Sequence, residues 1–243
     1  MPPRLQLVIP CYNEAGRLKP EAFLDVAGNG REISFVFVDD GSTDQTPAIL
    51  ADVARRGGEK IVVLTLGQNV GKAEAVHRGI LAAFERHPEF VGYWDADLAT
   101  PLAALPDFMD VFRTRPEVDI VMGARVKLLG RNVQRSLMRH YCGRVFATAA
   151  SFALGIDVYD TQCGAKIFRT TPAVRQIFAA PFRSQWVFDV EILSRYLAAA
   201  RTEQPESRIF EVPLSTWTAM PGSKLTAWHI VRAIWDLALV SRR

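Results

Sequence analysis

Four short polar clusters follow apolar segments in the first hundred residues of this chain, and their side chains are of types that bind metals, phosphates and sugars. In an open α/β sheet, ligands bind beyond the carboxyl ends of the strands. A single cluster of this kind is ordinary turn chemistry, whereas four in succession indicate one shared site. The clusters are Pro10–Glu14, Asp39–Ser42, Asn69–Lys72 and Asp95–Asp97.

Asp95 and Asp97 are the strongest candidates for metal ligands. In an extended segment, residues two apart point to the same side, which would bring the two carboxylates together. A hard divalent cation such as Mg²⁺ or Mn²⁺ relieves their repulsion and can hold a diphosphate at the same time. The alternative is a pair of solvated turn aspartates. The neighbouring clusters favour the metal site.

A basic segment occupies the middle of the chain, with no acidic residue between Asp119 and Asp157. If Asn132 caps a helix, Arg131, Arg135 and Arg139 are spaced four residues apart and fall on roughly one face. Like-charge repulsion destabilises this arrangement unless an anion binds there. The basic residues are Arg125, Lys127, Arg131, Arg135, Arg139 and Arg144.

The apolar run 145–154 follows this basic segment directly and is too short to span a bilayer. A cationic face beside an apolar body suits a lipid phosphate at a membrane surface, gripped by arginine side chains. A solvated basic face followed by a core helix is the alternative.

Short β-branched runs alternate with helical patterns, which predicts βαβ units and a mostly parallel sheet in an α/β fold. The length of 243 residues and the absence of a linker favour one domain. The expected strands are Leu5–Ile9, Ile33–Val38, Ile61–Leu66, Val91–Trp94 and Ile120–Met122.

The bulk composition is that of a globular protein, with 49% hydrophobic residues and a formal net charge of +3. Three cysteines without CxxC spacing argue against a disulfide framework or a zinc site and favour a cytoplasmic setting. We find no room for a signal sequence before the first strand and no membrane-spanning run. The expected location is therefore peripheral, on the inner face of a membrane.

The order of the motifs VIPCYNE, FVDDGSTD, NVGKA and DAD resembles that of family 2 inverting glycosyltransferases, over about Leu5 to Leu225. The resemblance implies a GT-A fold, with a Rossmann-like, mostly parallel central sheet flanked by helices. It also implies a nucleotide-sugar donor and no nucleic-acid partner. The residues that it places at the donor are Pro10, Tyr12, Glu14, Asp40, Lys72 and Asp95.

Within that family, DTQCG at 160–164, WVFDVE at 186–191 and GSKL at 222–225 resemble the dolichyl-phosphate glucosyltransferases. In the related mannose synthases, DAD is typically followed by Leu-Gln, whose amide helps to bind the metal. Here Leu98 is followed by Ala99, which leaves the third metal ligand open. The resemblance therefore implies UDP-glucose as donor and a polyprenyl phosphate as acceptor, with GDP-mannose as the alternative donor.

The same resemblance implies which residues serve the acceptor and the chemistry. Arg125 and Arg135 correspond to arginines near the donor and acceptor phosphates. Arg139 is a third predicted acceptor contact, although the synthases have a serine in its place. Ser223 and Lys224 of the GSKL motif are further acceptor contacts. Many family members use an aspartate near Asp189 as general base. Together, Asp189, Arg125 and Arg135 form the predicted catalytic set.

The last residues of the chain, 226–243, form a predicted amphipathic helix beyond a glycosyltransferase domain of residues 1–225. An apolar stripe on this helix suits a membrane interface, and packing onto its own domain is the alternative. The stripe consists of Trp228, Val231, Trp235 and Leu239. Two further alternatives for the whole chain are nucleotidyl transfer to a sugar phosphate and a sugar-nucleotide-binding regulator without turnover.

Overall fold

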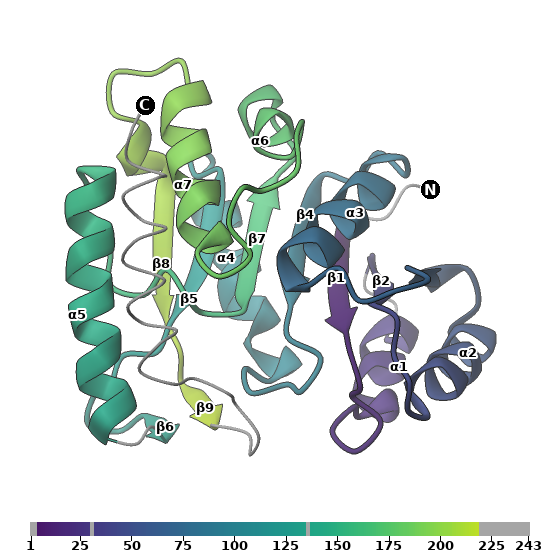
Figure 1. Cartoon of the computed structure of the whole chain (residues 1–243). Coiled ribbons are helices and arrows are strands. Elements are labelled where there is room, and N and C mark those ends of the chain that lie inside the picture. Colours follow the sequence, from purple (N-terminus) through teal and green to yellow (C-terminus); the bar gives the residue numbers. More distant parts are fainter. Residues whose placement is uncertain (1–3, 30–31, 135–136, 219–243) are drawn as a thin grey trace. The chain divides into compact units, whose positions relative to one another are not determined.

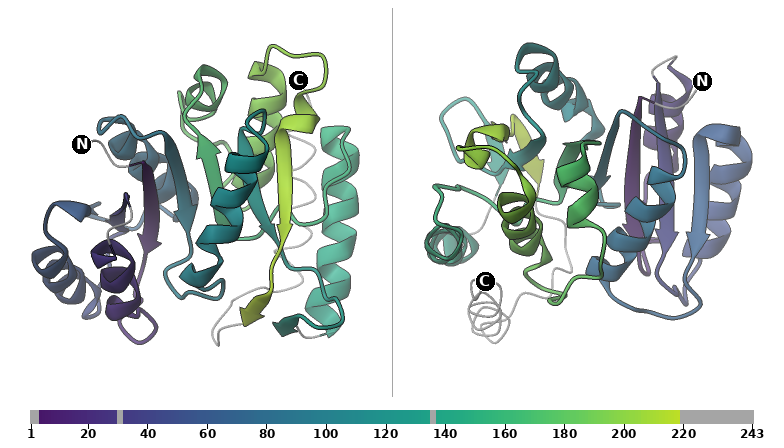
Figure 2. Two further views of the ribbon diagram at one scale, coloured as in Figure 1. Left: turned by 180° about the vertical axis from the view of Figure 1, so that it is seen from behind. Right: turned by 90° about the horizontal axis from the view of Figure 1, so that it is seen from above.

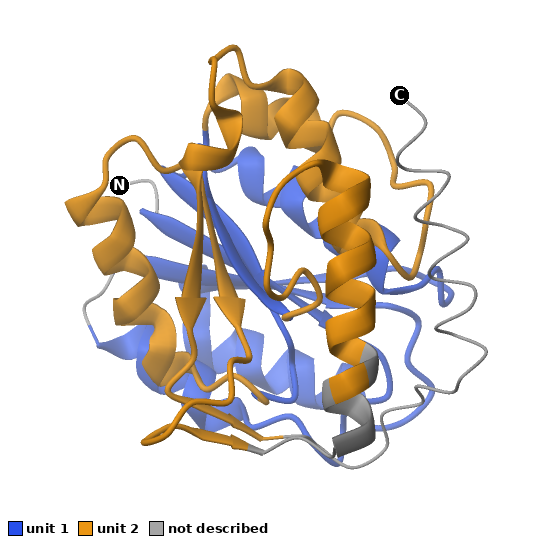
Figure 3. Ribbon diagram, turned by 90° about the vertical axis from the view of Figure 1, so that its left-hand side faces the viewer, with its two compact units in different colours: residues 1–98, 164–170 blue, residues 99–163, 171–243 orange. Residues whose placement is uncertain are grey.

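A computed structural model of the chain describes residues 4–29, 32–134 and 137–218. It contains two compact units, each formed from two separate stretches of chain (Figure 3). The first unit comprises residues 1–98 and 164–170, and the second comprises 99–163 and 171–243. The four polar clusters belong to the first unit and the basic segment belongs to the second.

The first unit alternates strands and helices, as the sequence predicts (Figure 1). Its first four strands match the first four predicted strands to within two residues at each end. The elements are β1 (Leu5–Cys11), α1 (Pro20–Gly28), β2 (Ile33–Asp39), α2 (Thr46–Gly57), β3 (Ile61–Thr65), α3 (Lys72–Phe84), β4 (Phe90–Trp94) and, much later in the chain, β7 (Ala165–Arg169).

The strands of the first unit pair in the order β3-β2-β1-β4-β7. All of these pairs are parallel except β4–β7, which is antiparallel. The chain moves outward from β1 to β3 and then returns to the other side of β1 with β4. The carboxyl ends of β1 and β4 therefore form a topological switch point, which is where open α/β sheets bind ligands.

Helices cover both faces of this sheet, which explains why a strand such as β2 is buried along its whole length. Phe23 of α1 packs edge-on against Phe35 and Phe37 of β2, with ring centroids 5.4 and 5.0 Å away. On the opposite face, Gly79 lets α3 approach Val8 so closely that an added Cβ would lie 2.4 Å from its side chain. Figure 2 shows the two helical layers.

The second unit begins with α4 (Leu105–Thr114) and β5 (Ile120–Ala124), the fifth predicted strand. Strand β5 pairs in parallel with β8, and β6 pairs in parallel with β9. The remaining elements are β6 (Asn132–Gln134), α5 (Leu137–Leu154), α6 (Pro172–Ile177), α7 (Phe188–Ala199), β8 (Ile209–Pro213) and β9 (Thr216–Thr218).

The predicted helix cap at Asn132 is wrong, because Asn132 begins the short strand β6. Its backbone N–H donates to the carbonyl of Ser215 at 2.9 Å, and it pairs with Thr216 of β9. Arg131 therefore precedes a strand and bonds to the Ser215 hydroxyl. Strand pairing overrides the local capping signal, so Arg131 does not share a helix face with Arg139, which lies in α5.

Candidate active site

A cavity of about 360 Å³ lies at the carboxyl ends of β1 to β4 in the first unit. The structure thus brings the four polar clusters together around one space, as their positions in the sequence predict. Every residue that the sequence analysis assigns to the donor or the metal lines it. The lining residues are Pro10, Cys11, Tyr12, Glu14, Asp40, Asn69, Gly71, Lys72, Ala75, Asp95, Ala96 and Asp97.

The loops that follow β1 and β2 are bonded to each other by small polar side chains. The Ser42 hydroxyl accepts from the Asn13 N–H at 3.0 Å, and the Asn13 side-chain oxygen accepts from the Thr43 N–H at 2.9 Å. The Thr46 hydroxyl accepts from the Glu14 N–H at 2.8 Å. These contacts, which the sequence analysis did not identify, hold the backbone of Tyr12 to Glu14 at the cavity wall.

Asp40 organises the loop after β3. Its carboxylate accepts backbone N–H bonds from Val70 at 2.7 Å and from Gly71 at 2.9 Å. Burial raises the pKa of this carboxyl, and the two N–H donors oppose that rise. Gly71 has a φ of 93°, in the region that favours glycine, and α3 starts at the next residue, Lys72. Asp40 thereby sets where Lys72 enters the cavity.

Glu14 forms a two-pronged ion pair with Arg17, with N–O distances of 2.9 and 2.7 Å. Burial raises the pKa of Glu14, Arg17 lowers it, and the charges of Asp97 and Asp95 raise it further. The like charges of Asp95 and Asp97 thus act unfavourably on Glu14. With Asp40, these acids make the cavity lining rich in negative charge.

Asp95 and Asp97 lie in a turn and not in the extended segment that the sequence analysis assumed. Leu98 has a φ of 52°, and its N–H donates to the Asp95 carbonyl at 3.2 Å. Strand β4 ends at Trp94, directly before Asp95. The alternation argument therefore fails, yet the turn still directs both carboxylates to the same cavity.

The Asp95 carboxylate is held between a cation and a glycine. Lys72 Nζ donates to Asp95 Oδ1 at 2.5 Å. The Asp95 N–H donates to the Gly164 carbonyl at 2.9 Å, and a Cβ added at Gly164 would lie 1.9 Å from Asp95 Oδ2. Only glycine fits here, which is a physical reason for the last residue of the DTQCG motif.

The carboxylates fit a divalent metal only if a ligand completes the site. Within the described residues, no group of three or more histidine, cysteine or acidic side chains is arranged to hold a metal. Mg²⁺ is commonly held by one or two carboxylates, with phosphate oxygens and water completing its shell. Asp95 and Asp97 supply that number of carboxylates on one cavity wall.

In the second unit, the side chain of Arg125 is already engaged by an acid. Its backbone N–H, Nε and Nη2 all donate to the Asp160 carboxylate, at 3.0, 2.6 and 2.7 Å. Its guanidinium also lies 5.4 Å from the centroid of the Trp217 ring. The Arg125 side chain is 15% exposed, so its orientation is set by the fold.

The turn that carries Asp160 is itself anchored to β8. The Glu211 carboxylate accepts from the N–H groups of Tyr159 and Asp160, both at 2.8 Å. Arg144 of α5 lies 4.0 Å from the Tyr159 ring centroid and donates to its carbonyl. The role of Asp160 and Glu211 was not predicted, because nothing in their spacing marks them as partners. Cys163, in the motif that follows, is fully buried.

Two buried acids, Asp189 and Glu191, lie in the first turn of α7. Glu191 accepts from the Arg183 N–H at 2.9 Å and from Arg195 Nη2 at 2.8 Å, so it ties the preceding loop to the helix. Asp189, the predicted base, is 5% exposed at the start of the same helix. Glu191 thus has a structural role, and the role of Asp189 as a base stays a prediction.

Several predicted acceptor residues fall outside the description. Arg135, Ser223, Lys224 and the predicted helix 226–243 lie outside the described residues. Arg139 belongs to α5, but its side chain is likewise outside the description. Their proposed roles stay predictions.

Helix α5 exposes apolar side chains along one side. Tyr141, Val145 and Phe152 are 66%, 60% and 92% exposed, and their spacing of four and seven residues places them on one face. Ala147 and Ala150 are buried on the other face. The apolar run after the basic segment is therefore not simply a core helix. No helix among the described residues has the length and apolar character needed to cross a bilayer.

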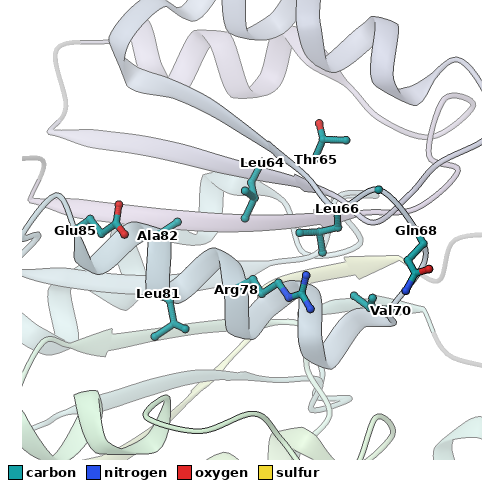
Figure 4. A pocket seen from close by; sticks show the side chains of 10 residues that line it. Leu64, Thr65, Leu66, Gln68, Val70, Arg78, Leu81, Ala82 and Glu85 are labelled. Atoms are coloured by element: carbon teal, nitrogen blue, oxygen red, sulfur yellow. The ribbon is translucent and has the colours of Figure 1, made fainter.

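A second, wider cavity of about 700 Å³ lies in the first unit between the end of β3 and α3 (Figure 4). Leu64, Leu66 and Leu81 give it apolar walls, and Arg78 and Glu85 add charge. None of the predicted site residues lines it. The smaller cavity is therefore the better candidate for the active site.

Residues 6–175 match the sequence profile described as Glycosyl transferase family 2. A Dictyostelium discoideum protein named dolichyl-phosphate beta-glucosyltransferase is 32% identical over 236 residues, covering 91% of this chain and 68% of its own. A Drosophila melanogaster protein of the same name is 33% identical over 254 residues, covering 97% of this chain and 74% of its own.

Among solved structures, glucosyl-3-phosphoglycerate synthase from Mycobacterium tuberculosis superposes with a TM-score of 0.68 at 18% identity. The match covers 98% of this chain and 79% of that one. That structure holds Mn²⁺, uridine diphosphate and glucosyl-3-phosphoglycerate. The similarity shows a GT-A fold, as the sequence motifs imply.

We expect Gly164→Ala to destabilise the first unit by about 1–3 kcal/mol, the usual cost of overpacking, because the new methyl group overlaps the Asp95 carboxylate. In the Asp95→Ala background the same substitution should cost much less. Urea denaturation of both single variants and the double variant measures this coupling. Gly28→Ala, where an added Cβ meets nothing within 4 Å, is the matched control. Equal costs in the two backgrounds would contradict the packing argument.

Proposed function

The chain belongs to glycosyl transferase family 2, and from that premise we propose that it transfers glucose from UDP-glucose to a polyprenyl phosphate at a membrane surface. The observation that carries the proposal is the cavity at the carboxyl ends of β1 to β4, where every predicted donor residue meets. The relatives named dolichyl-phosphate beta-glucosyltransferase support the sugar and the class of acceptor.

The donor's nucleoside binds, in this proposal, against the loops after β1 and β2. Tyr12 stands 44% exposed at the cavity rim, where its ring can lie against a base or ribose. Pro10, Glu14 and Asp40 form the adjoining wall. The hydrogen bonds between the two loops keep this wall in place before the donor arrives.

The diphosphate binds near Lys72, Asp95 and Asp97. Charge is the main difficulty of the reaction, because the leaving group gains negative charge as the glycosidic bond breaks. A bound Mg²⁺ or Mn²⁺ would neutralise that charge. Asp95 and Asp97 would hold the metal, and Lys72 adds one positive charge at the same wall.

A phosphate acceptor needs little help from a base. A phosphomonoester has a second pKa of roughly 6, so it already presents an anionic oxygen at neutral pH. Its attack on the anomeric carbon of the donor inverts the configuration there and yields a β-linked product. The task of the second unit is then to aim and neutralise that anion, which arginines do well. Asp189 would organise the sugar or a neighbouring cation.

Association with the membrane is supported by α5. The exposed Tyr141, Val145 and Phe152 lie on α5, which contains Arg139 and follows Arg125 and Arg135 in the sequence. An apolar helix face beside a basic segment suits a headgroup layer. A lipid phosphate would thereby reach the arginines without leaving its bilayer.

A panel of nucleotide sugars assayed with polyprenyl phosphate in detergent tests the proposed reaction directly. UDP-glucose should be the best donor, and uridine diphosphate should be released. Preference for GDP-mannose would overturn the proposed sugar, and release of pyrophosphate would indicate nucleotidyl transfer instead.

Asp97→Asn should lower turnover at least about 100-fold with little change in stability, because a neutral amide cannot replace one of two metal-binding carboxylates. Excess EDTA should have the same effect on the unmodified protein. Asp25→Asn, at an exposed position of α1, is the matched control. Full activity in EDTA would remove the metal from the proposal.

Arg135→Ala should lower turnover about 100-fold or more with the lipid phosphate as acceptor, the usual cost of losing an electrostatic contact to the transition state. Asp189→Asn should lower it less than about tenfold, since a phosphate anion needs no base. Arg201→Ala, an exposed arginine of the second unit, serves as control. The opposite ranking would indicate a hydroxyl acceptor.

Phe152→Ser should weaken partitioning onto liposomes about tenfold, because one large apolar side chain contributes roughly 1.5–3 kcal/mol on burial. Liposome flotation measures this partitioning, with Leu81→Ser, at an exposed leucine of the first unit, as control. A chain that ends at Lys224 tests the predicted C-terminal helix in the same assay. Unchanged flotation of both variants would argue against a membrane-bound enzyme.

A further inference from the structure

Lys72 lines the proposed donor cavity and pairs with one of the two predicted metal ligands. Its ammonium lies 2.5 Å from Asp95 Oδ1. Both residues line the same cavity as Asp97 and Glu14. The Lys72 ammonium is therefore a cation that the chain itself supplies to this site.

The backbone on both sides of this ion pair is fixed. Lys72 starts α3 directly after the two N–H groups that Asp40 holds. Asp95 is held by its N–H bond to the Gly164 carbonyl, and its carboxylate packs against Gly164, where an added Cβ would lie 1.9 to 2.3 Å from all three carboxylate atoms. The variable part is the lysine side chain, a flexible four-carbon stem that is 42% exposed.

The charges of the cavity explain why such a cation is needed. Glu14, Asp40, Asp95 and Asp97 line it as acids, and Lys72 is the one lysine or arginine in its lining. A diphosphate entering this space meets four carboxylates of like charge. A divalent cation on Asp95 Oδ1 and the Lys72 ammonium would compete for the same oxygen.

We propose that Lys72 is an exchangeable counterion: it neutralises Asp95 before the donor binds, and on donor binding it moves to a diphosphate oxygen and leaves Asp95 to the divalent cation. This inference rests on the proposed donor role of the cavity. In this exchange, bound metal raises the affinity for the nucleotide, and bound nucleotide raises the affinity for the metal. Each ligand favours the position of the Lys72 side chain that the other needs.

The exchange predicts effects of opposite sign on the two ligands when Lys72 is replaced by methionine, which has a similar length and no charge. Mn²⁺ alone should bind about two- to fivefold more tightly, since an exposed ion pair of this strength no longer competes. Uridine diphosphate in EDTA should bind about tenfold more weakly, because a charged donor to its phosphates is lost. A purely structural role for Lys72 would weaken both.

Calorimetric titration of the full chain with MnCl₂, and separately with uridine diphosphate in EDTA, measures both effects. Lys72→Arg should restore nucleotide binding, and Lys19→Met, at an exposed lysine of the same unit, should behave as the unmodified protein. Thermal unfolding of each variant verifies that it is folded.

Mn²⁺ affinity that is unchanged or lower in Lys72→Met would overturn the exchange, as would the absence of Mn²⁺ binding to both proteins. Failure of uridine diphosphate to bind the unmodified protein, with or without Mn²⁺, would instead overturn the proposed donor site. The two failures are thus distinguishable, because the Mn²⁺ titration needs no nucleotide.

Discussion

Repulsion among carboxylates is the constraint that shapes the first unit. A parallel sheet brings the ends of β1, β2 and β4 together, and with them Glu14, Asp40, Asp95 and Asp97. Each described partner of these acids offsets some of that charge: Arg17 for Glu14, two backbone N–H groups for Asp40 and Lys72 for Asp95. The same excess of negative charge favours the binding of a cation in the cavity and disfavours the binding of a diphosphate without one.

In the second unit the excess charge is positive, and a side chain of opposite charge again offsets part of it. Its basic segment contains no acid, yet Arg125 is held by Asp160 from a turn 35 residues later, and that turn is fastened to Glu211 of β8. A guanidinium that is bonded on one edge and stacked near Trp217 has little freedom to reorient. Such an arginine can act on a ligand without first losing side-chain entropy.

In the proposed reaction, each unit serves a different substrate. The acids and Lys72 of the first unit suit a metal-bound nucleotide sugar, and the arginines of the second suit an anionic acceptor. Glycines supply the close contacts that side chains would prevent, as at Gly164 beside Asp95 and at Gly79 beside Val8. The Gly164 contact explains how a motif far from Asp95 in the sequence takes part in its site: β7 pairs with β4, and Gly164 directly precedes β7.

The sequence by itself determined the parallel strands and the convergence of their polar ends, because apolar periodicity and the rules of βαβ connection depend on local residue types. It also determined the family, through motifs that occur in a fixed order. Only the tertiary structure decided which partners these residues have. Asn132 lies in a strand because it bonds to Ser215 and pairs with Thr216. Asp95 and Asp97 line the cavity from a turn and not from a strand. The ion pairs of Lys72 with Asp95 and of Arg125 with Asp160 join residues 23 and 35 positions apart. Such pairs depend on long-range packing, which no local pattern in the sequence encodes.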